Sequence, residues 1–235
     1  MSIDLDVLNQ RFKNESVESL ITYFLEAHKG RIALASSYGA EDQVLTDTIL
    51  KIDSTAKIFT LDTGRLPEET YTVMDQTNQK YGINVEVYCP DGAAVEALYQ
   101  TQGINGFRMS VENRKTCCQV RKMEPLRRAL SGLDVWITGL RRAQSPTRET
   151  MQLIEWDEAN GLIKLNPLIE WDEDQVWDYI KTNKVPYNVL HTQGYPSIGC
   201  APCTRAIGEG EDIRAGRWWW ENPEHKECGL HRRGN

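Results

Sequence analysis

The chain of 235 residues lacks any run of about 18 apolar residues, the length that crosses a bilayer, so we expect no membrane segment. Its start, MSIDLDVLNQRF, lacks the basic residues and continuous apolar stretch of a signal peptide. Internal repeats and low-complexity tracts are also missing. These absences predict a cytoplasmic globular protein that does not associate with membranes.

Basic residues are too few for a general nucleic-acid surface, because 27 Lys and Arg stand against 34 Asp and Glu, a net charge of −7. We therefore expect no nucleic-acid partner, and local basic segments must carry any anion binding. The four histidines are too few and too scattered to indicate a His-based metal site. The Gly-Lys-Ser/Thr of a Walker loop is absent, which argues against ATP hydrolysis of that kind.

Short apolar runs alternate with amphipathic segments from residue 31 onward: RIALASSYG, EDQVLTDTILK, AKIFTLDTG, PEETYTVMDQTNQKYG and NVEVYCP. This alternation predicts an α/β fold, a doubly wound and mostly parallel sheet flanked by helices, with ligands at the carboxyl ends of the strands. DVWITGL predicts another central strand, and DEDQVWDYIKTNKVP predicts a helix. The spacing of apolar residues over 1–28 predicts a leading helical segment.

Two loops follow the first two predicted strands, where such a sheet binds nucleotides. Glycines in both loops permit close backbone approach, and serine hydroxyls with free N–H groups at a helix start suit phosphate. Serine and aspartate also cap helices, so the loops alone leave both interpretations open. The candidate nucleotide contacts are Ser36, Ser37, Gly39, Asp62, Thr63, Gly64 and Arg65.

Five of the six cysteines fall into three groups: the adjacent Cys117 and Cys118, the Cys-x-x-Cys of Cys200 and Cys203, and Cys228 in ECGLH. Thiolates are both metal ligands and the reactive form of cysteine, so we predict a four-cysteine metal centre and a nucleophilic Cys228. Zinc and iron–sulfur both use such ligands. Adjacent helical residues project about 100° apart, which favours a wide 4Fe-4S cube over a single zinc ion.

Cationic residues accompany these cysteines. Arg121 and Lys122, four residues after the paired cysteines, would lie on the same helical faces and neutralise an anionic cube. Arginines recur in GLRRAQSPTR and in DIRAGR, and a guanidinium binds phosphate or sulfate with two donors at once, although a solvated surface is the alternative. The candidate anion contacts in these segments are Arg142, Arg148, Arg214 and Arg217, and His231 is a further candidate.

The sequence changes character after about residue 202, where Gly, Trp and charged residues dominate and periodicity is weak. We therefore predict one α/β nucleotide-binding and iron–sulfur domain over 1–205, and a flexible C-terminal tail over 206–235 that carries Cys228. A mobile tail could carry the thiol between a buried substrate and an outside reductant.

Almost the whole chain resembles the assimilatory adenosine 5′-phosphosulfate (APS) reductases of the sulfonucleotide reductase family. The resemblance lies in TCCQVRKMEPLRRAL, TGLRRAQSPTR, GYPSIGCAPCTR, GRWWWE and KECGLH, which occur in this order. It implies a fold related to the ATP pyrophosphatases (adenine nucleotide alpha hydrolase-like), with SSYGAED as a modified phosphate loop.

The resemblance also implies residue roles. Cys117, Cys118, Cys200 and Cys203 would hold a 4Fe-4S cluster, and Cys228 would attack the sulfate sulfur of APS to leave AMP and an S-sulfocysteine. Thioredoxin or a similar dithiol would then release sulfite, as part of sulfate assimilation and cysteine biosynthesis. Lys122, Arg148, Arg214, Arg217 and His231 would surround the phosphosulfate, the two loops would hold the nucleotide, and Arg142 is a less certain contact.

Three alternatives remain at this point. A 3′-phosphoadenosine 5′-phosphosulfate (PAPS) reductase, or an enzyme that uses both nucleotides, would share the fold, although the four cysteines and Arg65 favour APS. A tRNA-thiolating enzyme would share the loop, but the acidic charge counts against it. A structural zinc module would leave Cys228 inert. The sequence also leaves open whether the protein forms a homo-oligomer.

Overall fold

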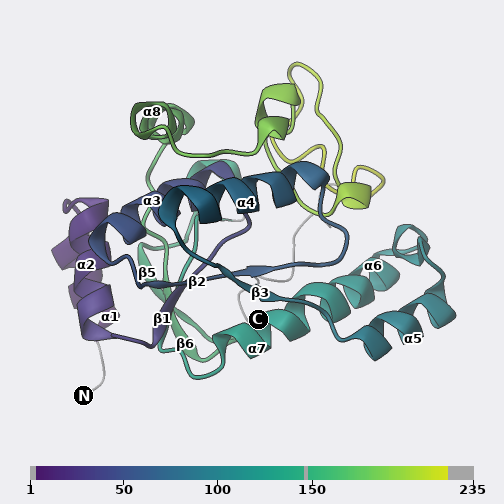
Figure 1. The fold of residues 1–235 in the computed structure, drawn as a ribbon, viewed down its shortest axis with the longest axis horizontal. Coiled ribbons are helices and arrows are strands. Elements are labelled where there is room, and N and C mark those ends of the chain that lie inside the picture. Colours follow the sequence, from purple (N-terminus) through teal and green to yellow (C-terminus); the bar gives the residue numbers. More distant parts are fainter. Residues whose placement is uncertain (1–3, 146–147, 222–235) are drawn as a thin grey trace.

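The computed structural model describes residues 4–145 and 148–221, and Figure 1 shows a central sheet between layers of helices. The strands are β1 Ile32–Ala35, β2 Lys57–Leu61, β3 Glu86–Tyr88, β4 Val135–Ile137, β5 Ile154–Asp157 and β6 Leu162–Leu165. The α-helices are α1 Leu5–Phe12, α2 Val17–Ala27, α3 Ala40–Ile52, α4 Glu68–Tyr81, α5 Gly92–Gln102, α6 Val111–Cys118, α7 Glu124–Leu130 and α8 Glu173–Asn183. The shorter helical segments are η1 Gly106–Arg108, η2 Gln119–Met123, η3 Arg142–Gln144, η5 Val189–Gln193 and η6 Ala201–Cys203.

The six-stranded sheet has the order β3-β2-β1-β4-β6-β5 and is parallel except for β5, which pairs antiparallel with β6. The chain runs outward from β1 to β3 and then returns to place β4 on the other side of β1. The carboxyl ends of β1 and β4 therefore flank a topological switch point, where open α/β sheets bind ligands. The predicted fold class is confirmed.

Strand residues alternate between two apolar layers. Ile32 and Leu34 pack with α2, α3 and α8 on one face, whereas Ala33 and Trp136 pack with α7 on the other. Because both faces of these parallel strands are buried, their sequences are short continuous apolar runs and do not alternate between apolar and polar residues. Residues that must reach solvent are thus confined to the strand ends, where the loops begin.

The leading helical segment is two helices rather than one. Ser16 begins α2 by accepting a hydrogen bond from the backbone N–H of Ser19 at 3.1 Å, a typical N-cap. α1 contacts β5, and Asn9 donates to the carbonyl of Ile154 at 2.8 Å. The hairpin β5–β6 was not predicted from the sequence, and α1 helps to hold it at the sheet edge.

The beginning of the predicted tail packs against the domain as far as the structure describes it. Ile207 donates its N–H to the carbonyl of Gly194 at 2.8 Å, and Arg205 donates to Gly216 at 3.0 Å. Residues 222–235, which include Cys228 and His231, lie outside the described residues, so the boundary at residue 205 stays a prediction.

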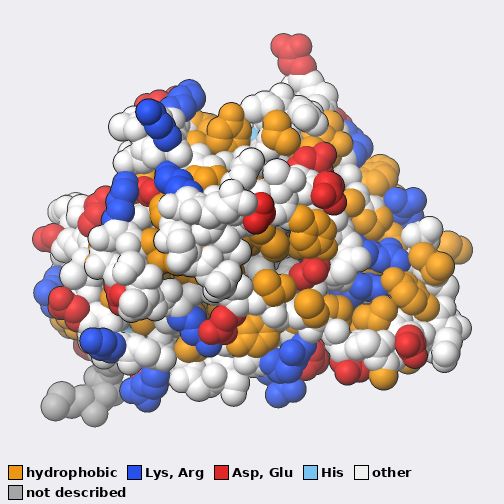
Figure 2. All heavy atoms as spheres, viewed as in Figure 1, with side chains coloured by type: hydrophobic (Ala, Val, Ile, Leu, Met, Phe, Trp, Pro, Cys, Tyr) orange, Lys and Arg blue, Asp and Glu red, His pale blue; other side chains and the backbone are white. Residues whose placement is uncertain are grey.

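The described surface shows no membrane-crossing element, because no helix in 4–145 and 148–221 is both long and apolar enough to span a bilayer. On the face in Figure 2, acidic and basic side chains are interspersed among hydrophobic ones. This face therefore carries no broad basic patch that would attract an anion.

Candidate active site

A cavity of about 240 Å³ lies at the switch point, at the carboxyl ends of β1, β2 and β4. Ser36 and Ser37 reach it from β1, Thr63 from β2, and Thr138 from β4. We call it the main cavity. Its basic lining residues are Lys122, Arg148, His191, Arg214 and Arg217.

The loop between β1 and α3 presents backbone N–H groups to this cavity. Gly39 is the N-cap of the 13-residue α3 and contributes no side-chain cap, while the Ser36 hydroxyl accepts from the backbone of Tyr38 at 3.2 Å. The first N–H groups of a helix have no partner within the helix and carry partial positive charge. Neither serine side chain therefore caps α3, which removes the interpretation of Ser36 and Ser37 as helix caps. The free N–H groups at the start of the helix can instead bind an anion.

Tyr38 adopts a left-handed backbone conformation, with φ of 61°, within this loop. Its side chain is buried, its hydroxyl has no hydrogen-bond partner among the described residues, and burial raises its pKa. A non-glycine residue in this conformation is strained. The strain lies at the turn that aims the serines into the cavity.

Asp42, in the first turn of α3, holds the loop closed. Its carboxylate accepts from the Ser37 backbone N–H at 2.6 Å and from the Ser37 hydroxyl at 2.7 Å. Burial, the largest effect, raises the pKa of Asp42 to about 6. Gly139 packs directly on this carboxylate, and a Cβ there would clash with it and meet the Asp42 backbone nitrogen at 3.1 Å. The sequence TGL after β4 therefore requires glycine at this position.

Glu41 organises the opposite wall. It accepts from Arg141 Nε at 2.7 Å and from Gln144 Nε2 at 2.9 Å, and the Gln144 amide oxygen in turn accepts from the Arg148 guanidinium. Arg148 is buried although it carries a charge. This network fixes the arginine at the cavity through the segment after β4.

A second, smaller cavity brings the four predicted ligands together. Cys117 and Cys118 reach it from the end of α6, and Cys200 and Cys203 from η6 and the residue before it. We call it the cysteine cavity. Among the described residues its lining includes four thiols, no imidazole or carboxylate, and the cationic side chains Arg65, Arg114, Arg121, Lys122 and Arg217.

This donor set fits an iron–sulfur cube, because such a cluster takes four thiolates and is a net anion among cations. Four thiolates also suit zinc. In residues 4–145 and 148–221 no three His, Cys, Asp or Glu side chains are grouped as for one metal ion. Burial raises the pKa of the Cys203 thiol to about 12 despite the opposing effect of Lys122 and Arg217, so a thiolate at this position requires a bound metal.

The cysteine cavity adjoins the loop after β2. The Thr63 hydroxyl lies 3.2 Å from Cys200 Sγ, and Ala201 donates its N–H to the Arg65 carbonyl at 2.8 Å. Arg121 is buried and donates to the Thr63 carbonyl and to the Tyr99 hydroxyl, both at 2.6 Å. One loop therefore contributes to both cavities.

A π-helical turn, η2, follows the paired cysteines, with Glu124 donating its N–H to the Gln119 carbonyl five residues back. Such turns insert one extra residue and recur at functional sites. Arg121 and Lys122 lie within this turn and, as predicted, line the cysteine cavity together with the paired cysteines. Lys122 also lines the main cavity.

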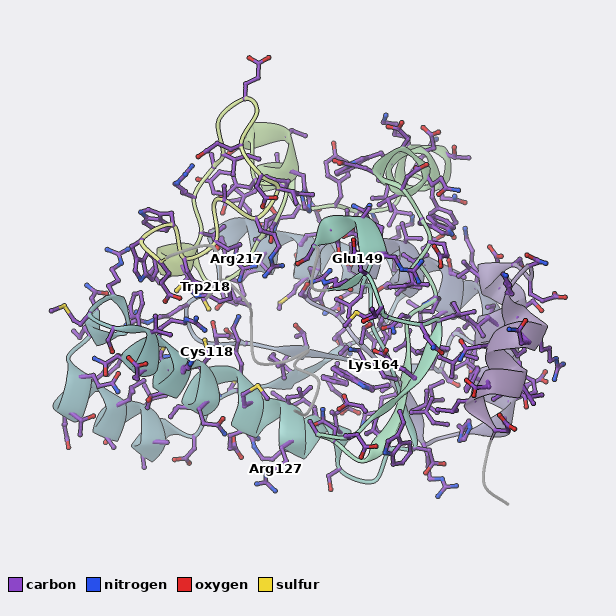
Figure 3. All side chains as sticks on the ribbon, turned by 180° about the vertical axis from the view of Figure 1, so that it is seen from behind. Cys118, Arg127, Glu149, Lys164, Arg217 and Trp218 are labelled. Carbon is purple, nitrogen blue, oxygen red and sulfur yellow. The ribbon has the colours of Figure 1, made fainter. Side chains whose placement is uncertain are left out.

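Arg217 is the second side chain that lines both cavities. In Figure 3 it lies beside Trp218 and near Cys118, whereas Arg127 points away from the body. Arg217 donates to the Ser197 hydroxyl at 3.2 Å. Two cations thus join a nucleotide-type loop to a four-thiol centre.

Comparisons with known proteins agree with this geometry. Residues 31–206 match the model of the phosphoadenosine phosphosulfate reductase domain. The chain belongs to this family. An adenosine 5′-phosphosulfate reductase of Allochromatium vinosum is 57% identical over 202 residues, 86% of this chain and 79% of that protein. One from Burkholderia cepacia is 49% identical over 219 residues, 93% of this chain and 87% of that protein.

Solved structures agree with this family membership. A phosphoadenylyl-sulfate reductase from Candida auris, in a phosphate complex, has a TM-score of 0.75 and 27% identity, and covers 88% of this chain and 99% of its own. An FMN adenylyltransferase of Candida glabrata shows the same fold at 16% identity, with a TM-score of 0.57 and coverage of 97% of this chain and 79% of its own. The predicted resemblance to APS reductases is confirmed, and the second structure confirms the fold.

The predicted contacts of this phosphosulfate reductase family member divide into three sets. Those that line the main cavity are Ser36, Ser37, Gly39, Thr63, Lys122, Arg148, Arg214 and Arg217. Cys228 and His231 lie outside the described residues. The remaining four, which the structure does not bring to the main cavity, are Asp62, Gly64, Arg65 and Arg142.

These four have other contacts. Asp62 accepts from the Gly64 N–H at 2.7 Å and so shapes its own turn, while Arg65 donates to the Ile104 carbonyl at 2.5 Å beside the cysteine cavity. Arg142 pairs with Glu170. Their roles in substrate binding stay predictions.

Sequence reasoning missed several lining residues of this family member. The predicted loop segments contain Glu41, Asp42 and Gly139. Nothing in the sequence indicated that these three residues would lie in contact. His191, for which no role was predicted, also lines the main cavity, and burial lowers its pKa. The position of Thr138 at the carboxyl end of β4 is the one signal that could have identified a missed residue.

Proposed function

We propose that this protein reduces adenosine 5′-phosphosulfate to sulfite and AMP with electrons from a dithiol. The observation that carries the proposal is the shared wall between the two cavities, in which Lys122 and Arg217 face both the anion-binding loop and the four thiols. The APS reductases that match at 49–57% identity support the same substrate.

The main cavity suits the nucleotide and its phosphosulfate. N–H groups at the start of α3 and the Ser36 and Ser37 hydroxyls would receive one anionic group. Arg148 and Arg217 would receive another through paired donors. Neutralising the substrate in this way lowers its repulsion of an approaching thiolate.

Cys228 would be the nucleophile. Its thiolate forms a bond to the sulfate sulfur, and AMP leaves with the electron pair of the broken S–O bond. A thiolate of thioredoxin or a similar dithiol then attacks Cys228 Sγ, sulfite leaves with the S–S electron pair, and the second thiol of the reductant restores the Cys228 thiol. The dithiol thus supplies both electrons.

Cys117, Cys118, Cys200 and Cys203 would hold a 4Fe-4S cluster. When bound, such a cluster supplies a fixed anionic charge behind the substrate site, without a change of redox state in this proposal. Lys122 would lie between that charge and the substrate, so its ammonium group is held toward the reacting sulfate.

The second candidate is PAPS reduction, which the Candida auris relative's name favours at 27% identity. The four thiols around one cavity favour the APS activity, because the resemblance of the sequence to APS reductases implies those ligands.

The first experiment purifies the protein without oxygen and records its visible spectrum, iron and sulfide content. Sulfite release is then assayed with APS, reduced thioredoxin, and PAPS in parallel. Brown protein that acts on APS supports the proposal. Colourless, zinc-loaded and inactive protein would instead indicate a structural module.

Two variants separate the nucleophile from the cluster. Cys228→Ser should keep its iron and lose sulfite release, whereas Cys200→Ser should lose both colour and activity. Cys89→Ser is the matched control, because Cys89 is exposed and lines neither cavity. Turnover by Cys228→Ser would show that another group attacks the sulfate.

A further inference from the structure

Residues 217–221 are held against both segments that carry the predicted cluster ligands. Trp218 donates its backbone N–H to the Cys203 carbonyl at 3.1 Å, and Arg217 forms a bridge with Thr204. Glu221 donates its N–H back to the Trp218 carbonyl at 2.8 Å. The turn is therefore fixed to the loop of the second cysteine pair.

The Trp218 side chain lies against two guanidinium groups. The Arg114 Cζ is 4.7 Å from the Trp218 ring centroid and the Arg217 Cζ is 4.9 Å from it, both within cation–π distance. Trp218 is 1% exposed and has a φ of 41°. A buried tryptophan in this strained conformation persists only where its surroundings hold it.

Arg114 and Glu221 provide that hold. The Arg114 Nε and Nη2 atoms donate to the two carboxylate oxygens of Glu221 at 3.0 and 2.7 Å, with side chains 2% and 3% exposed. Arg114 lies in α6, one turn before the paired cysteines. This buried, two-pronged ion pair ties the turn to the helix of the first cysteine pair.

Arg217 connects this arrangement to the main cavity. Its guanidinium passes over Gly199, where a Cβ would clash with it, and donates to Ser197 Oγ at 3.2 Å and to the Ile198 carbonyl at 3.3 Å. The side chain is only 7% exposed. Its position is thus set by Trp218 on one side and by the backbone before Cys200 on the other.

We propose that Arg114, Trp218 and Glu221 form a positioning unit, the clamp, that fixes Arg217 in the main cavity and couples the cysteine cavity to anion binding. This inference rests on the proposed function. Movement of α6 or of the Cys200–Cys203 loop is transmitted to Arg217 through the ring of Trp218. None of the three clamp residues lines the main cavity.

The test measures binding rather than turnover. In a Cys228→Ser background, which stops the proposed reaction, calorimetry without oxygen gives the affinity for APS. Arg114→Met with Glu221→Met removes both charges together and leaves no unpaired buried ion. We expect this clamp variant to retain its iron and to bind APS about tenfold more weakly, since a charged hydrogen-bonding group is misplaced.

A double-mutant cycle then identifies the cause. Arg217→Lys should weaken binding about tenfold when the clamp is intact and less than about threefold in the clamp variant, because Arg217 is already misplaced there. Lys51→Met is the control, since it breaks an ion pair to the buried Asp47 away from both cavities, and it should leave APS affinity unchanged.

The proposal would be overturned if Arg217→Lys weakened APS binding by the same factor with and without the intact clamp. It would also be overturned if the clamp variant bound APS with wild-type affinity. If the clamp variant does not fold, Trp218→Phe replaces it in the double-mutant cycle, and its effect on APS affinity must be non-additive with that of Arg217→Lys. Additive effects of these two substitutions would also overturn the proposal. If the Cys228→Ser protein with an intact clamp does not bind APS at all, the proposed function fails and the clamp's role fails with it.

Discussion

The buried carboxylate of Asp42 holds the loop between β1 and α3, and its burial makes the stability of the fold depend on pH. Its pKa rises to about 6 in the folded protein from 3.8 because burial penalises the charged form. The folded state therefore keeps a proton that the unfolded chain has released. The stabilisation is complete below pH 3.8 and is lost as the pH rises through about 6.

We predict that Asp42→Asn removes this dependence. Relative to the variant, the wild type should lose about 2 kcal/mol of unfolding free energy between pH 4 and pH 7, measured by urea denaturation. Asp53→Asn is the control, because hydrogen bonds from Thr55 lower the pKa of Asp53 and its effect should have the opposite sign. A pH-independent difference for Asp42→Asn would contradict the assignment.

Gly139 lies so close to Asp42 that a side chain at position 139 would clash with it. Alanine there would press on the Asp42 carboxylate and backbone, so we expect Gly139→Ala to cost about 1–3 kcal/mol of unfolding free energy and to weaken AMP binding. Gly92→Ala, where no atom lies within 4 Å, should cost nothing measurable. Equal unfolding midpoints for the two variants would refute the close packing.

At the scale of elements, the π-helical turn after α6 decides which side chains accompany the cysteines. In a regular helix each side chain points about 100° from the one before it. The extra residue of η2 changes the directions of Lys122, which lies in the turn, and of Leu126, which follows it. The amino-acid pattern over 111–130 gave no sign of the turn.

Deleting Gln119 should restore regular helical spacing and rotate the paired cysteines away from Lys122. We expect the deletion variant to be folded by circular dichroism and to bind far less iron than the wild type. Gln119→Ala keeps the chain length and should keep its iron. A deletion variant with full iron content would show that the turn does not set the ligand geometry.

At the scale of the whole molecule, the cysteine cavity joins segments far apart in the sequence. α6 packs with η1 and η2, whereas Cys200 and Cys203 follow the sheet and α8. A centre held by all four thiols would act as a cross-link, which restricts the unfolded chain. Its contribution should therefore extend to the stability of the whole fold.

Removing iron with a chelator should lower the thermal midpoint by about 10 °C, from loop-closure entropy on the order of 4 kcal/mol. The measurement is a thermal scan by circular dichroism without oxygen, before and after chelation. Cys200→Ser, which should lack the cluster already, should not respond. An unchanged midpoint in the wild type would mean that the centre does not cross-link the fold.

The sequence by itself determined the classes of element and of chemistry. Alternating apolar and amphipathic segments specify strands and helices because these patterns act over a few residues. The thiol groupings around Cys117 and Cys200 identify ligand types for the same local reason. The five predicted strand and helix segments between residues 31 and 90 and the strand at DVWITGL were obtained in this way.

Only the tertiary structure decided which of these parts meet. The β5–β6 hairpin, the contact of Gly139 with Asp42, the Arg114–Glu221 ion pair and the shared position of Lys122 all depend on packing between distant segments. Pairings of this kind are set by burial and chain closure over long separations, and many alternatives fit the same local pattern. The sequence thus predicted the reacting groups, and the packing of β4 beside β1 brought most of the predicted substrate contacts to one cavity.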